Sequence, residues 1–149
     1  GSKNGFVYKY KIETFPVYFF YKEKKAESLK KASEELKKMN DAGISDRIIT
    51  EENSDNVIDS KGNGKIISYK RINRNQIEIN AETDTDCILC ISEMYDLNWN
   101  VFVDGKQSSF FPANITFIGV SIEKGIHTIS LIHKDDMMKM LKRLIFKKI

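Results

Sequence analysis

The spacing of apolar residues predicts strands at the start of the chain. Between residues 6 and 12 every second residue is aromatic or apolar, namely Phe6, Tyr8, Tyr10 and Ile12. Successive side chains of a strand point to opposite sides of its sheet, so this alternation predicts a strand with one apolar face. The run at residues 16–21 is apolar nearly throughout, which predicts a second strand that is buried on both faces.

The spacing changes to that of a helix between residues 25 and 42. Apolar residues recur there three or four positions apart and so form one stripe of an amphipathic helix: Ala26, Leu29, Ala32, Leu36 and Met39. Gly43 follows, and glycine readily adopts the left-handed conformation that ends a helix. A short β-prone run at residues 47–50 comes next. Residues 1–52 therefore predict a strand–helix–strand element.

The rest of the chain predicts a β-sandwich. From Lys65 onward, β-prone runs and turn residues recur every eight to twelve positions, which is typical of an antiparallel sandwich. The predicted strands are residues 66–72, 76–81, 87–94, 98–103, 108–111, 115–122 and 127–133. The predicted fold class is mainly β (α+β). A jelly-roll-like antiparallel sandwich at residues 65–134 follows the N-terminal element along the chain. The polar residues 51–64 mark the boundary between the two.

Residues 135–149 predict a C-terminal basic helix. Asp135 and Asp136 suit the positive end of a helix dipole, and the Lys and Arg residues that follow suit the negative end. One side of this helix is apolar and the other is basic. Three interpretations stay open: the helix packs on the sandwich, lies on an anionic membrane, or leads into a membrane span.

Composition narrows the classes of function. The chain has 149 residues, of which 41% are hydrophobic and 30% are charged, as expected for one globular domain. The net charge is +3, and the excess of basic residues lies on the two predicted helices. A nucleic-acid interface instead gathers basic and aromatic residues on one face, so we expect no nucleic-acid partner. No apolar run reaches the ~18 residues of a membrane span.

The residue types that carry chemistry form no catalytic or metal-binding pattern. Cys87 and Cys90 are three positions apart in one predicted strand, so their side chains face opposite sides and no disulfide joins them. His127 and His133 lie too far apart along another strand to share a metal ion. The sequence therefore predicts no metal site and no cofactor.

Carboxylates are plentiful, and a glycosidase needs two of them at a fixed separation. Glu93, Asp96 and Asp104 are candidates, but their spacing selects no pair. A small hydrolase therefore stays a hypothesis of function, ranked behind two non-catalytic ones. Asp104 is better explained as the first residue of a two-residue hairpin turn with Gly105.

Trp99, the only tryptophan, has two interpretations. It shares a face with Val101 and Val103, which favours a place in the core between two sheets. Alternatively, its ring stacks on the apolar face of a sugar, where neighbouring polar groups orient the ligand. The residues predicted to contact such a ligand are Trp99, Tyr95, Asn98, Asn100 and Asn114.

Several short motifs resemble one family when they are taken in order. They are W-x-V-x-V-D-G-K at residues 99–106, Ala113-Asn114, F-I-G-V at residues 117–120, and Gly125-Ile126-His127. Together they resemble the C-terminal extracytoplasmic domain of the YfhO-like bacterial membrane proteins, in which Pro-Gly commonly stands where this chain has Leu97-Asn98. The resemblance implies that these motif residues are structural: Asp104, Gly105, Gly119, Gly125 and His127.

The resemblance also implies a function. YfhO-like proteins are similar to multi-span membrane glycosyltransferases whose catalytic residues lie outside the C-terminal domain. The chain is then a non-catalytic accessory domain on the extracytoplasmic face of the bacterial membrane. Its expected partners are the membrane domain of the same protein and a glycan or cell-wall polymer. The leading alternative is a free-standing secreted module that binds carbohydrate or protein.

Overall fold

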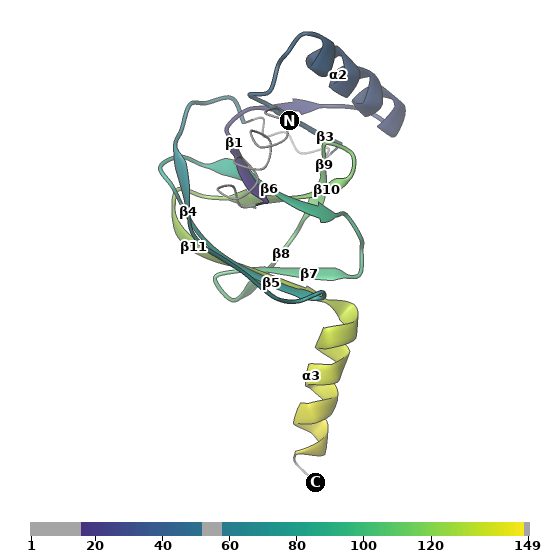
Figure 1. The fold of residues 1–149 in the computed structure, drawn as a ribbon, viewed down its shortest axis with the longest axis vertical. Coiled ribbons are helices and arrows are strands. Elements are labelled where there is room, and N and C mark those ends of the chain that lie inside the picture. Colours follow the sequence, from purple (N-terminus) through teal and green to yellow (C-terminus); the bar gives the residue numbers. More distant parts are fainter. Residues whose placement is uncertain (1–15, 52–57, 148–149) are drawn as a thin grey trace, which may run out of the picture.

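Two facing β-sheets and two helices make up the fold in a computed structural model, which describes residues 16–51 and 58–147 (Figure 1). The first sheet contains β1 (Val17–Phe20), β2 (Glu23–Lys25), β3 (Ile48–Thr50), β6 (Cys87–Met94), β9 (Phe111–Ala113) and β10 (Phe117–Ile122). The second contains β4 (Gly64–Asn73), β5 (Gln76–Thr83), β7 (Trp99–Val103), β8 (Lys106–Ser108) and β11 (Gly125–His133). The helices are α2 (Leu29–Asp41) and α3 (Lys134–Phe146).

The strand order confirms the predicted fold class. The six-stranded sheet runs β1-β6-β10-β9-β3-β2 and the five-stranded sheet runs β4-β5-β11-β7-β8. Neighbouring described strands pair antiparallel, except that β2 and β3 are parallel. A short turn, Arg74-Asn75, joins the antiparallel strands β4 and β5, whereas the parallel strands β2 and β3 are joined through α2, because a parallel pair needs a longer crossover.

The main core fills the space between the two sheets. Alternate residues of β5, β7 and β11 face alternate residues of β6 and β10, as the period of two requires. The buried side chains are Ile77, Ile79, Val101, Ile129 and Leu131 from one sheet and Leu89, Ile91, Ile118 and Val120 from the other. Burial of this apolar surface is the main favourable contribution to folding.

The N-terminal part is a β2-α2-β3 unit, which confirms the predicted strand–helix–strand element. Ser28 caps α2, since its Oγ accepts a hydrogen bond from the N–H of Lys31 at 3.2 Å. Gly43 follows the helix with φ of 70°. The buried face of α2, Ala32 and Met39, packs against Ile49 of β3. Because β3 pairs with β9, this unit shares a sheet with the later strands, although the division of the chain into separate parts stays a prediction.

Some predicted strand boundaries are wrong. The run at residues 16–21 is not buried on both faces, because Tyr18 of β1 is 49% exposed. The predicted strand at residues 108–111 falls between β8 and β9. The strand predicted from residue 115 begins at Phe117, since Asn114 and Ile115 form a turn with φ of 47° and 74°. The strand predicted at residues 6–12 lies outside the described residues.

The C-terminal helix is confirmed, but it does not pack on the sandwich. In Figure 1, α3 (yellow) projects from the end of the sheet that contains β5, β7 and β11 and points away from both sheets. None of its residues is buried. Leu144 and Ile145 are each 61% exposed and Phe146 is 69% exposed. The first of the three interpretations of this helix is therefore not what the structure shows.

Candidate functional site

Trp99 lies in the core at the start of β7. Its side chain is 7% exposed and belongs to the cluster of buried residues between the sheets. The indole and the imidazole of His133 form a T-shaped pair, with ring centroids 5.3 Å apart and ring planes at 88°, a favourable aromatic geometry. The indole therefore presents little surface on which a sugar ring could stack.

The other residues predicted to contact a ligand lie in two places. Asn98 and Asn100 are close to Trp99, where the backbone C=O of Asn98 accepts from Lys134 N–H at 2.7 Å and the side chain of Asn100 donates to the C=O of Ile132 at 3.4 Å. Tyr95 is half-buried with its ring 5.6 Å from that of Phe110. Asn114 lies in the turn between β9 and β10.

The amide oxygen of Asn114 is already engaged, because it accepts from the backbone N–H of Ile49 at 2.9 Å. This contact ties the turn before β10 to β3. The structure thus brings Asn98 and Asn100 together near Trp99 and separates Asn114 from them. A ligand-binding role for these residues stays a prediction.

The family motif residues Asp104, Gly105 and His127 form a lock between two turns. Asp104 and Gly105 have φ of 52° and 80°, as a two-residue hairpin turn with positive φ requires. The carboxylate of Asp104 accepts from the N–H of Thr128 at 2.8 Å and contacts Nδ1 of His127 at 2.7 Å. Nε2 of His127 lies 2.8 Å from the C=O of Glu123. The β7–β8 turn is therefore joined to the start of β11.

Hydrogen bonding shifts the pKa of both partners in this lock. The pKa of Asp104 is lowered, first by the backbone N–H of Thr128 and then by His127. Burial of the His127 ring lowers its pKa, but contacts with Asp104 and with the carbonyl of Glu123 outweigh burial, so that the net pKa is raised. The ionised pair is therefore favoured.

The two motif glycines outside this lock also have structural positions. Gly119 lies in β10 directly beneath the ring of Phe111, where a Cβ atom would collide with that ring. Gly125 begins β11 with φ of 133°, a conformation that L-residues rarely adopt.

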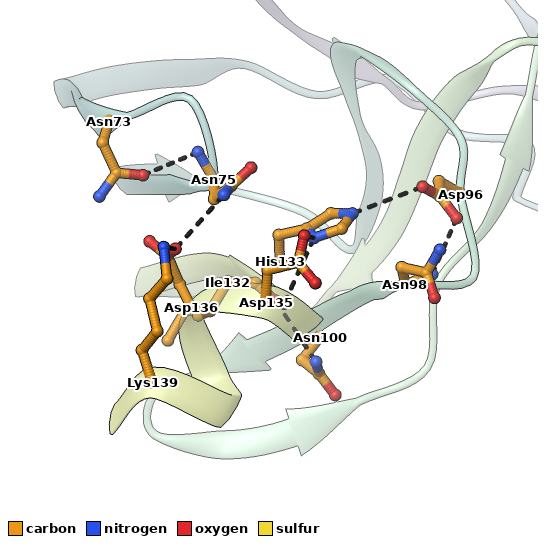
Figure 2. A network of polar contacts seen from close by, with 10 residues as sticks. All are labelled: Asn73, Asn75, Asp96, Asn98, Asn100, Ile132, His133, Asp135, Asp136 and Lys139. Carbon is orange, nitrogen blue, oxygen red and sulfur yellow. Dashed lines mark hydrogen bonds and ion pairs between the residues drawn. The ribbon is translucent and has the colours of Figure 1, made fainter. Parts of the chain in front are cut away.

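A polar network fixes the base of α3 to the sandwich, and Figure 2 shows its side chains. We call it the α3 junction, and it consists of Asn75, Asp96, Asn98, His133 and Asp136. His133 Nε2 lies 3.5 Å from a carboxylate oxygen of Asp96, and the amide nitrogen of Asn75 donates to Asp136 at 3.3 Å. His133 also precedes the helix as its N-cap, with Nδ1 accepting from the N–H of Asp135 at 3.5 Å.

Backbone hydrogen bonds complete the α3 junction. The N–H of His133 donates to the C=O of Asn75 at 2.8 Å, and the N–H of Lys134 donates to the C=O of Asn98 at 2.7 Å. The first turn of α3 is thus held by the β4–β5 and β6–β7 turns, while its later turns stand free. Sequence reasoning missed His133 as a cap, although a His-x-Asp pattern directly before an apolar-periodic run could have indicated it.

A groove of about 420 Å³ lies beside the α3 junction. One wall is the β4–β5 turn, residues 73–76, and the other is formed by Asp136, Lys139, Met140 and Arg143. We call it the basic groove, because Arg74, Lys139 and Arg143 outnumber Asp136. Lys139 lies 3.8 Å from Asp136. Arg74 and Arg143 have no carboxylate partner among the residues that the structure describes.

The carboxylates considered for hydrolysis are engaged in separate contacts. Glu93 pairs with Arg71, Asp96 belongs to the α3 junction, and Asp104 belongs to the lock with His127. Cys87 and Cys90 are buried free thiols in different core clusters, and burial raises the pKa of each to about 11. In residues 16–51 and 58–147, no group of three or more His, Cys, Asp or Glu side chains is placed to hold a metal ion.

Within the described ranges, neither helix has the length and apolar character needed to cross a membrane.

Searches of curated proteins and of solved structures give no match. The family model described as bacterial membrane protein YfhO matches residues 49–141, which is more than half of the chain and includes the lock, the α3 junction and most of the sandwich. The chain belongs to the YfhO family of bacterial membrane proteins.

Proposed function

We propose that this chain is a non-catalytic accessory domain on the extracytoplasmic face of a multi-span membrane protein related to glycosyltransferases. The observation that carries the proposal is α3, an amphipathic helix that projects from the sandwich with its apolar residues uncovered. In a member of a membrane-protein family, such a helix is suited to a position at the membrane surface. The sandwich would then lie next to the membrane.

The polar groups of the sandwich support a structural role. The lock and the α3 junction place their His and Asp side chains in contacts between turns, and Trp99 is buried. A rigid body held beside the membrane can position an acceptor, such as a cell-envelope glycan or polymer, or stabilise the membrane domain. Of these two roles, the second needs no ligand site on the sandwich.

Cysteine labelling of the full-length protein in intact bacterial cells tests the placement. Lys106→Cys puts a thiol at the exposed tip of the β7–β8 hairpin. The natural Cys87 and Cys90 give a low background, because burial and a pKa of about 11 keep them as inaccessible thiols. A membrane-impermeant maleimide should label Lys106→Cys in intact cells, and fractionation should recover the labelled protein with the membrane.

Two controls make the outcome clear. The protein without the new cysteine gives the background labelling, which Lys106→Cys should exceed, and permeabilised cells should show full labelling of Lys106→Cys. Labelling of the variant only after permeabilisation would overturn the extracytoplasmic placement. Recovery of the protein as a small soluble species outside the cell would instead support the secreted binding module.

A further inference from the structure

We infer that α3 binds the surface of an acidic phospholipid bilayer, with its apolar side among the acyl chains and its basic residues on lipid phosphates. This inference deepens the proposed function by naming the partner of α3, and it rests on the proposed position beside the membrane. It does not depend on which side of the membrane the sandwich faces.

The apolar side of α3 has the width and spacing of a membrane-surface helix. Its residues follow the spacing i, i+3, i+4, i+7 and i+8, and we call them the apolar arc: Met137, Met140, Leu141, Leu144 and Ile145. At 100° per residue they cover a broad continuous face. Four of the five are exposed, from 45% at Met140 to 61% at Leu144 and Ile145, so the sandwich leaves this face uncovered.

The charge of α3 complements an anionic surface. Residues 134–147 contain five Lys or Arg against two Asp, which gives a net charge of +3. The two Asp residues are in the first turn, so the part of the helix that projects furthest carries only positive charges. On a helical projection, Lys142 and Lys147 lie on the two flanks of the apolar arc. Long cationic side chains in that position reach the headgroup level while the apolar face is buried.

The basic groove adds a place for a lipid headgroup. Arg74 from the β4–β5 turn faces Lys139 and Arg143 of α3 across it, and guanidinium groups bind phosphate oxygens well. Met140 belongs both to the groove and to the apolar arc. A phosphate bound between Arg74 and Arg143 would therefore have its acyl chains beside the apolar face.

A second copy of the chain fits this face less well. A coiled-coil seam is a narrow stripe at two of every seven positions, whereas the apolar arc is broad. The flanking Lys142 and Lys147 would also approach like charges on a parallel partner. The lipid surface satisfies both the apolar arc and the charges, which favours it as the occupant.

Vesicle co-sedimentation of the 149-residue chain tests the inference. We expect binding to vesicles of phosphatidylcholine mixed with phosphatidylglycerol, and much weaker binding to vesicles of phosphatidylcholine alone. Each basic residue near an anionic surface contributes about fivefold to affinity, so Lys142→Gln with Arg143→Gln should lower binding by at least about tenfold. Raising the salt concentration should reduce the binding of the unchanged chain in the same direction.

Leu141→Ser with Leu144→Ser should abolish binding to both kinds of vesicle, because these substitutions place two hydroxyl groups at the centre of the apolar arc and remove both of its leucines. Two control variants match the chemistry at other sites. Lys37→Gln with Lys38→Gln removes two lysines from α2, and Leu97→Ser removes a leucine that is 80% exposed in the β6–β7 loop. Both should bind vesicles as the unchanged chain does.

Three outcomes would overturn the inference. They are absence of binding to acidic vesicles, equal loss of binding in the control variants, and a dimer in sedimentation velocity that Leu141→Ser with Leu144→Ser dissociates. Failure here leaves the labelling of Lys106→Cys unaffected, because that readout reports the side of the membrane and not contact of α3 with lipid. The two proposals can therefore fail separately.

Discussion

The two helices of this chain are alike in sequence and opposite in placement. Each has thirteen residues, a lysine-rich face and an apolar face. The apolar face of α2 rests on β3, with Ala32 fully buried and Met39 7% exposed. The helix α3 has no buried residue and is attached only through its first turn. Amphipathic spacing thus indicates that a helix has a partner, but not that the partner is the rest of the same domain.

Their charges differ in a way that fits their surroundings. In α2, four lysines are balanced by three acidic residues on the solvent side, which is typical of a helix that faces water. In α3, the acidic residues are confined to the first turn and every later charge is positive. The difference indicates that the two helices have different environments, and the following variants probe it.

The largest effect is expected from the core between the two sheets. Trp99→Ala should lower the free energy of unfolding by ~3–5 kcal/mol, as expected when a buried aromatic side chain is truncated. Both helices should lose structure together, since β7 positions β11 and β11 leads into α3. Chemical denaturation followed by circular dichroism measures this. A folded variant that has lost only affinity for a glycan would instead support the ligand-contact interpretation of Trp99.

A matched pair of substitutions separates the two helices directly. Met39→Ala in α2 should cost about 2–3 kcal/mol, because it leaves a cavity above Ile49. Met140→Ala in α3 should change stability by less than ~0.5 kcal/mol, since Met140 is 45% exposed. Urea denaturation of both variants measures the difference. Equal costs would contradict the contrast between a packed and a projecting helix.

The sequence predicts the sandwich well where strands are long and turns are distinctive. The strands β5, β6, β7 and β11 are within about two residues of their predicted bounds, because each has five or more residues, with either an alternating pattern or, in β6, a continuous apolar run. The residue pair Asp104-Gly105 by itself predicts the hairpin turn that the structure shows. The short strands β2, β8 and β9 have three residues each, too few for a period, and tertiary pairing alone defines them.

The α3 junction could not be predicted for a different reason. Its members come from two turns, the end of β11 and the first turn of α3, and polar residues in turns are common on any surface. Only the register of β11 against β5 and β7 brings Asn75 and Asp96 to either side of His133. Likewise, the apolar stripe of α3 has the same spacing as that of α2, so the sequence did not distinguish a helix that packs on the sandwich from one that projects from it.

The lock at the far end of β11 predicts a modest pH dependence. The raised pKa of His127 makes its contribution to stability complete below the unfolded value of ~6.5 and lost as pH rises through the folded value. The lowered pKa of Asp104 makes its contribution complete above ~3.9 and lost as pH falls. The melting temperature should therefore fall slightly from about pH 6 to pH 8.

His127→Gln should remove this part of the slope, and thermal melts at a series of pH values measure it. The control leaves the lock intact and changes only the part of the chain at the other end of β11. A chain that ends after Lys139 keeps the lock, so its slope should equal that of the intact chain. An unchanged slope in His127→Gln would show that other groups cause the pH dependence.

The smallest effect on stability is expected from removing most of α3. A chain that ends after Lys139 retains the α3 junction but loses the exposed later turns. Its melting temperature should stay within ~2 °C of the intact chain, since for a chain of this size such a shift is below ~1 kcal/mol. Binding to acidic vesicles should nevertheless be lost, because Leu141, Leu144 and the basic flanks are gone. Calorimetry and co-sedimentation on the same preparation measure the two properties.

This truncation distinguishes the two interpretations of an amphipathic helix. A fall in melting temperature comparable to that of Met39→Ala would mean that α3 packs on the sandwich in solution as α2 does on β3. An unchanged melting temperature with lost vesicle binding would mean that the apolar arc stabilises an association with lipid and contributes nothing to the fold. The sandwich then folds without α3, whereas α3 needs the sandwich to position its first turn.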